Sequence, residues 1–138
     1  MISVQGMNVL LRKIAKANGE VQAKVKRANQ ITSLNIERGA KRNTIKSVDT
    51  GRLRSAIVAD HSGEEANVEV KVNYAQYVEF GTGAFAAEYL ATKDKDLREY
   101  AMTFFETGKG RMPAQPFLFP AAEAERPKHI ERMRKALQ

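Results

Sequence analysis

The residues best suited to chemistry in this sequence are few and scattered. His61 and His129 have no second histidine or carboxylate at the spacing of a metal motif such as H-E-x-x-H. Cysteine is absent, which excludes disulfides, thiolate metal ligands and cysteine nucleophiles. We therefore predict no metal-ligating residue and no cofactor, and we place His61 in a loop and His129 on a polar helix face.

Asp60-His61-Ser62 contains the three residue types of a hydrolytic triad. Neighbouring residues of an extended chain point to opposite faces, so consecutive positions cannot form the proton relay. We expect a polar turn here instead. Because no pair of carboxylates stands out as an acid–base couple, we predict no catalytic residue and a protein that is not an enzyme.

Two glycine pairs, Gly81-Thr82-Gly83 and Gly108-Lys109-Gly110, resemble fragments of phosphate-binding loops. Neither completes a P-loop or a dinucleotide-binding motif, and neither lies between a buried strand and a helix. We expect these glycines to supply positive φ angles at turns.

The composition indicates a soluble globular chain that forms a single domain, residues 1–138. Hydrophobic residues make up 43% and charged residues 28% of the 138 positions. No apolar run approaches the roughly 20 residues that span a bilayer, and we expect no signal or targeting segment. Synthesis in a reducing cytoplasm, with no membrane partner, is the expectation.

The positive charge is concentrated in the first part of the chain. Residues 1–54 hold twelve Lys or Arg against three acids, a net of +9, whereas residues 55–138 hold eleven against thirteen, a net of −2. This asymmetry fits a DNA-facing surface, a basic face that meets the acidic face of a neighbouring subunit, or a solvated helix face. The candidate DNA- or partner-facing residues are Arg12, Lys13, Lys16, Lys24, Arg27, Lys41 and Arg42.

The elements that would position these residues predict an α+β fold. A long N-terminal helical segment (1–47), interrupted at Asn18-Gly19, packs on a small antiparallel β-sheet, and a C-terminal helix completes the chain. Asp49-Thr50-Gly51 marks a cap before a helical turn that carries Leu53. The predicted strands are 55–61, 67–73 and a proline-bracketed edge strand at 116–119.

Two further helical elements are expected, besides the C-terminal helix. Residues 74–80 suit a helical turn and residues 88–105 a helix. Pro120 suits the first position of the C-terminal helix, and Pro127 should kink or restart that helix. The segments are thus 1–47, 48–83 (turn, hairpin and short helix), 84–112 (an inserted loop or helix) and 113–138.

Three segments in order resemble a known pattern: residues 48–57, 73–83 and 112–122. This pattern is similar to the neck or tail-completion family of long-tailed bacteriophages, whose members are also labelled minor tail or head–tail joining proteins. The stretch between Gly83 and Met112 is longer than in the compact form of the pattern. The residues that carry the resemblance are Asp49, Thr50, Gly51, Leu53, Tyr74, Val78, Glu79, Phe80, Gly81, Thr82, Gly83, Pro116, Phe117 and Pro120.

The resemblance implies a virion structural protein at the head–tail junction, assembled in the host cytoplasm. Such a subunit would form a homo-oligomeric ring and contact a head-closure or adaptor protein and a tail terminator or tail tube protein. Transient weak contact with genomic DNA in the channel is compatible with this role. The alternative, from the charge asymmetry alone, is a basic nucleic-acid-binding module.

Aromatic residues of the second half could stack on nucleobases, but they are not interleaved with the basic residues. Core packing or a subunit interface is favoured for them. We expect some of the apolar residues around Phe80, Phe85 and Phe104–Phe105 to pack between subunits.

Overall fold

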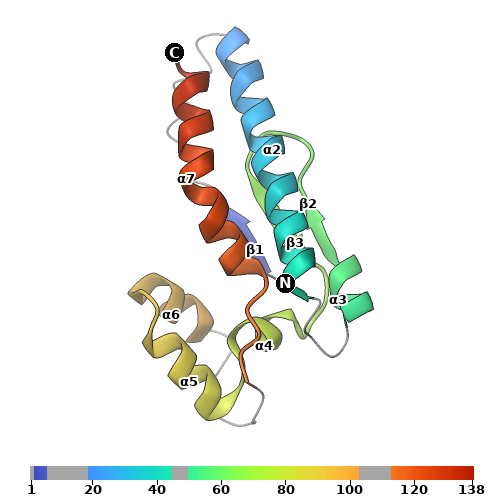
Figure 1. The fold of residues 1–138 in the computed structure, drawn as a ribbon, viewed down its shortest axis with the longest axis vertical. Coiled ribbons are helices and arrows are strands. Elements are labelled where there is room, and N and C mark those ends of the chain that lie inside the picture. Colours follow the sequence, from blue (N-terminus) through green and yellow to red (C-terminus); the bar gives the residue numbers. More distant parts are fainter. Residues whose placement is uncertain (1, 6–18, 45–49, 103–112) are drawn as a thin grey trace.

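The computed structural model describes residues 2–5, 19–44, 50–102 and 113–138. It has the expected α+β fold. Two long helices, α2 (Gly19–Asn43) and α7 (Leu118–Ala136), lie side by side, and α2 also contacts strands β2 and β3 of a small sheet (Figure 1). The described part of α2 begins at Gly19, next to residues outside the description, so the interruption at Asn18-Gly19 stays a prediction. Arg12, Lys13 and Lys16 also lie outside the described residues.

The α2 helix is long because its sequence lacks proline and because small or apolar residues recur along it. Val25, Ala28, Ile36 and Ala40 are at most 5% exposed and follow the helical repeat along one side. Polar Asn29, Thr32 and Ser33 are buried with them. The helix therefore needs hydrogen-bond partners on the elements that it contacts.

The sheet is antiparallel with strand order β1-β3-β2. The strands are β1 (Ile2–Gln5), β2 (Ile57–Ala59) and β3 (Asn67–Val70), and β3 pairs with both others. The valines of β3 are fully buried, as the alternating sequence predicted. The prediction of an edge strand at 116–119 is wrong, because Leu118 already begins α7. The third strand is β1, so the predicted helical segment 1–47 is wrong at residues 2–5.

The loop between β2 and β3 is fastened to α2. Asn29 Nδ2 donates to the Gly63 carbonyl at 2.8 Å. Gly63 has φ +80°, and a Cβ there would stand 2.4 Å from Lys26 Cγ, so no larger residue fits without a shift. Because α3 ends at Ser55 and the loop follows Ala59, β2 is shorter than the predicted 55–61. Strand β3 ends at Val70, before the predicted residue 73.

Four short helices complete the fold, the first between α2 and β2 and the other three between β3 and α7. They are α3 (Thr50–Ser55), α4 (Ala75–Phe80), α5 (Gly83–Ala91) and α6 (Lys95–Met102). The turn carrying Leu53 and the helix near 74–80 are confirmed. The single helix predicted for 88–105 is wrong, because Asp94 Oδ1 accepts the Leu97 N–H at 2.9 Å and so begins a second helix.

The α7 helix continues through Pro127, so it does not restart there, which was one of the two predicted outcomes. Pro127 is exposed, so the carbonyl that it leaves without a partner can be hydrated. Where α2 and α7 approach closely, a Cβ built on Gly39 would lie 3.1 Å from Ala121 Cβ. Gly39 therefore permits the close contact of the two helices.

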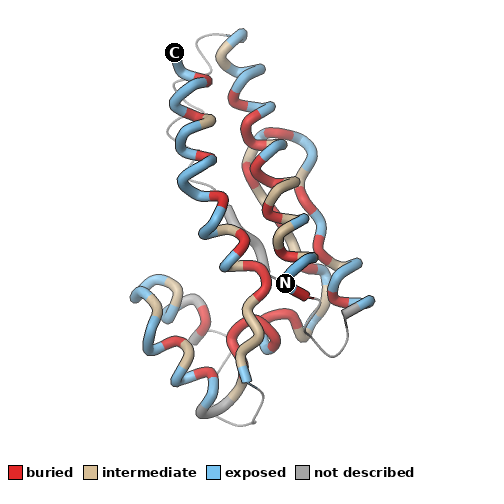
Figure 2. Tube along the Cα trace, in the orientation of Figure 1, coloured by how far each residue is buried: buried red, intermediate tan, exposed pale blue. Residues whose placement is uncertain are grey.

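The main core lies between α2, the sheet and the start of α7. It contains Ile36, Ala40, Leu53, Ile57, Ala59, Val68, Val70, Ala75, Val78, Phe117, Leu118 and Ala121. Figure 2 shows buried positions along the facing sides of α2 and α7 and exposed positions on their outer sides. Two smaller clusters extend this core, one between the far ends of α2 and α7 and one around Phe80.

Gly39→Val should separate the two long helices. We expect it to lower the free energy of unfolding by about 1–3 kcal/mol, because the added methyl groups meet Ala121 in a packed seam. Gly51→Val is the matched control, since nothing lies within 4 Å of a Cβ at Gly51. Equal denaturation midpoints for the two variants in urea would contradict the close contact.

Candidate functional site

The three sequence segments that carry the family resemblance meet in the core. Leu53 from the first, Val78 from the second, and Phe117 and Leu118 from the third belong to one buried cluster. The Gln115 N–H donates to the Val78 carbonyl at 2.8 Å, which ties the third segment to the second. Arg52 lies over the Tyr74 ring, 5.9 Å from its centroid, which ties the first segment to the second.

Glu79 is the polar centre of this arrangement. Its side chain is fully buried, and Oε2 accepts the N–H groups of Phe117 and Leu118 at 2.8 and 2.9 Å. Its Oε1 accepts the Phe119 N–H at 3.0 Å. A helix leaves its first four N–H groups without intrahelical partners. Glu79 accepts hydrogen bonds from three of these N–H groups. The fourth position is Pro120, which has no N–H.

This carboxylate explains why residues 116–119 are not a strand. The Phe117, Leu118 and Phe119 amides are turned together toward one acceptor, so the chain enters a helix at Leu118. Pro120 lies in the first turn, where a fixed φ is tolerated, but it is not the first helical residue as predicted. Burial raises the pKa of Glu79, and the three amide donors oppose that rise.

Phe80 and Gly81 complete the junction beside Glu79. Phe80 is fully buried, with its ring centroid 5.5 Å from that of Phe119, so it is core and not an exposed contact residue. Gly81 has φ +77°, as predicted for this turn. Gly83 does not have a positive φ and begins α5 directly after Thr82. Gly108 and Gly110 lie outside the described residues, as do Asp49 and Phe104–Phe105.

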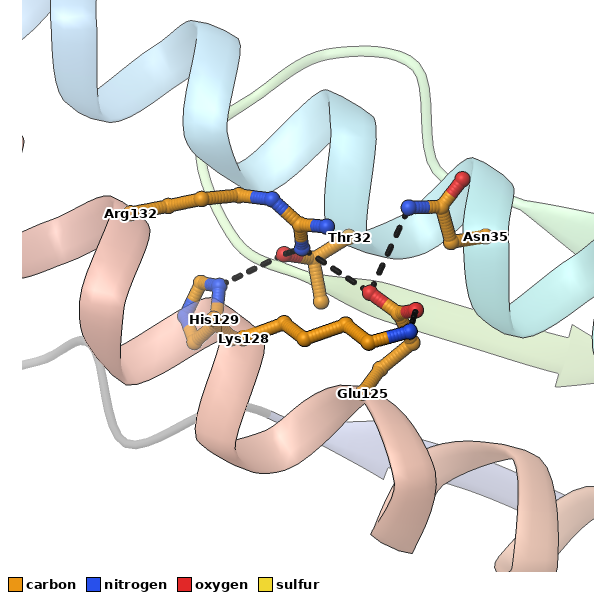
Figure 3. A network of polar contacts seen from close by, with 6 residues as sticks. All are labelled: Thr32, Asn35, Glu125, Lys128, His129 and Arg132. Carbon is orange, nitrogen blue, oxygen red and sulfur yellow. Dashed lines mark hydrogen bonds and ion pairs between the residues drawn. The ribbon is translucent and has the colours of Figure 1, made fainter.

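A second polar group links α2 to α7 (Figure 3). Arg132 Nη1 donates to Thr32 Oγ1 and to Glu125 Oε2, both at 2.9 Å. Thr32 Oγ1 is also 2.7 Å from His129 Nδ1. Asn35 Nδ2 donates to Glu125 Oε2 at 3.3 Å, and Lys128 Nζ is 3.5 Å from Glu125 Oε1. The network gives the buried polar residues of the helix seam their partners.

His129 is therefore not on a polar outer face, as predicted, but is only 8% exposed between the helices. Burial lowers its pKa, and the nearby Arg132 guanidinium lowers it further, while Glu125 acts in the opposite direction. Glu125, His129 and Arg132 recur at helical spacing opposite Thr32 and Asn35. That shared period was the one signal by which the sequence could have revealed the network.

The predicted basic residues are only partly brought together. Lys24, Arg27 and Arg42 are exposed on α2, whereas Lys41 is half-buried and pairs with Glu37 at 2.6 Å. The Asp60-His61-Ser62 segment is a turn in which Asp60 Oδ1 accepts the Ser62 N–H at 2.8 Å. That hydrogen bond lowers the pKa of Asp60.

Within the described ranges, no group of three or more acidic or histidine side chains is placed to hold a metal ion. The described helices include none that combines the length and apolar character needed to cross a bilayer. The polar side chains described above form hydrogen bonds between helices.

Glu79→Gln should weaken the fold although it is nearly isosteric. The amide keeps one acceptor oxygen but turns an NH2 toward at least one buried N–H. We expect a loss of about 1–3 kcal/mol in the free energy of unfolding, measured by urea denaturation. Glu123→Gln, an exposed position on α7, is the control and should change stability by less than about 0.5 kcal/mol. Two indistinguishable variants would contradict the capping role.

His129 should make the protein less stable in mild acid. Its folded-state pKa lies below its unfolded value, so the unfolded chain binds the extra proton first. Stability is full above about pH 6.5 and declines as the pH falls toward the lower folded pKa, by at most about 1.4 kcal/mol per pH unit. Melting curves of His129→Gln should lose this decline, whereas His61→Gln, at an exposed position, should keep it. A decline that survives His129→Gln would refute the assignment.

A comparison with models of protein families gives a match over the first part of the chain. A family model described as "Bacteriophage HK97-gp10, putative tail-component" matches residues 8–81. No curated protein and no solved structure matches the chain. The matched range contains α2, β2, β3 and α4 and includes Glu79, while α7, which Glu79 caps, lies beyond it. Since the match covers more than half of the sequence, the chain belongs to the HK97 gp10-like family of bacteriophage tail components.

Proposed function

We propose that this protein is a virion structural subunit at the phage head–tail junction. In this proposal it forms a homo-oligomeric ring that connects the head-closure complex to the tail. Its partners would be other copies of itself, a head-closure or adaptor protein, and a tail terminator or tail tube protein. The observation that carries the proposal is membership of a phage tail-component family.

The arrangement of the three segments that carry the family resemblance supports a structural role rather than a catalytic one. Leu53, Glu79 and Phe117 are each at most 1% exposed and serve the core. The Glu79 carboxylate is used in holding α4 to α7, so it is not presented to a ligand. A structural subunit of this kind acts through its exposed surfaces.

One such surface is suggested by α5. Phe85 is 41% exposed, the most exposed of the large apolar side chains in the described part of the chain. A ring built from one repeated contact needs two different complementary faces on each subunit. The net charges of +9 and −2 on the two parts of the sequence supply electrostatically distinct faces.

The proposal is tested by assembling the protein with its neighbours from the same phage genome. Electron microscopy and native mass spectrometry should show a closed ring between the head-closure protein and the tail. A chain that stays monomeric in the presence of these partners would contradict the proposal. Tight DNA binding at physiological salt, without any partner, would favour the nucleic-acid-binding module instead.

Phe85→Ser should weaken ring formation without unfolding the subunit. We expect the midpoint concentration of assembly, followed by native mass spectrometry, to rise at least about tenfold, because an exposed aromatic contact is removed. Leu137→Ser, 36% exposed at the C-terminal end of the chain, is the control. Unchanged assembly by Phe85→Ser, with an unchanged melting temperature, would exclude this face.

A further inference from the structure

Four basic side chains share one face of α2. Lys24, Arg27, Arg38 and Arg42 are all exposed. At 3.6 residues per turn they project within about 60° of one another and extend over about 27 Å of helix. We call these four residues the α2 cation stripe. Figure 2 shows the exposed positions that recur along the outer side of this helix.

The fold neutralises the other cations of α2 but not this stripe. Lys26 pairs with Glu64 at 3.3 Å, and Lys41 pairs with Glu37 at 2.6 Å. Glu37 is itself fixed, since its Oε2 accepts the Ala59 N–H at 2.9 Å. Among the ion pairs of the described residues, none involves a member of the stripe. The stripe therefore carries its four charges uncompensated.

The composition of this face indicates which anion it suits. A protein interface has an apolar, aromatic-rich centre, but the only large exposed apolar residue of α2 is Ile31. The one acid of the described helix on this projection, Glu20, lies at its first turn. Ile31 lies between the two pairs of cations on this same face, but one apolar side chain is too little for the centre of a protein interface. Point charges along one helix face suit a phosphate backbone, which offers a negative charge about every 1.7 Å of duplex.

We propose that the α2 cation stripe is a contact surface for the DNA backbone that carries no sequence readout. Four phosphate contacts give a log–log salt slope of about −3.6 and a loss of about a hundredfold in affinity between roughly 50 and 200 mM salt. Such a contact is weak at physiological salt and lets the duplex slide. The DNA contact requires only the folded subunit, so it can be tested independently of ring formation.

The test is fluorescence anisotropy of the full chain with a short random-sequence duplex, titrated at several salt concentrations. The stripe variant combines Lys24→Gln, Arg27→Gln, Arg38→Gln and Arg42→Gln. The control combines Lys95→Gln, Arg98→Gln, Arg126→Gln and Arg134→Gln, which are exposed and match the stripe in residue types and net charge change. Circular dichroism melts first establish that both variants fold.

We expect the stripe variant to bind at least about tenfold more weakly at roughly 50 mM salt and to lose most of the salt slope. The control should stay within about twofold of the unmodified chain. Equal weakening of the two variants would overturn the proposal, since net charge alone would then explain binding. Competition by poly-glutamate as effective as that by DNA of equal charge would overturn it in favour of an acidic protein partner.

Discussion

The structure depends on one buried carboxylate. Glu79 is separated from water on every side, and burying a charge is costly unless several donors meet it. The donors come from backbone that lies 38 to 40 residues further along the chain. The start of α7 must therefore return to α4, and this requirement fixes where the second long helix begins and which side of it faces the core.

From that start, α7 lies along α2, and polar side chains of the two helices lie opposite one another. Gly39 permits the close approach near the beginning of α7. Further along the seam, Thr32 meets His129 and Arg132, so the buried polar atoms of one helix are matched by those of the other. The two helices and the sheet enclose the main core, and exposed positions remain on the outer sides of α2 and α7 and on the short helices α5 and α6 (Figures 1 and 2). That division suits a subunit that works by assembly.

Local patterns were enough to predict α2, β3, α4 and the turn that carries Leu53. The alternating valines of β3 and the proline-free sequence of α2 are local signals, because they depend on neighbouring residues alone. Residues 116–119 were not predictable in this way, because Phe-Leu-Phe between prolines suits a strand or a helix start, and Glu79 decides between them from far away. The β1 strand of four residues is too short to be recognised by its own period, and the burial of His129 depends on a helix nearly a hundred residues earlier.

The central claim is tested most directly by amide hydrogen exchange at Phe117, Leu118 and Phe119, followed residue by residue by NMR. If the Glu79 carboxylate holds these three amides, they should exchange as slowly as the amides of β3, even though they precede or begin the helix. In the Glu79→Gln protein at least one of them should exchange faster while β3 stays protected. Exchange of all three at the rate of an open loop in the unmodified protein would contradict the account.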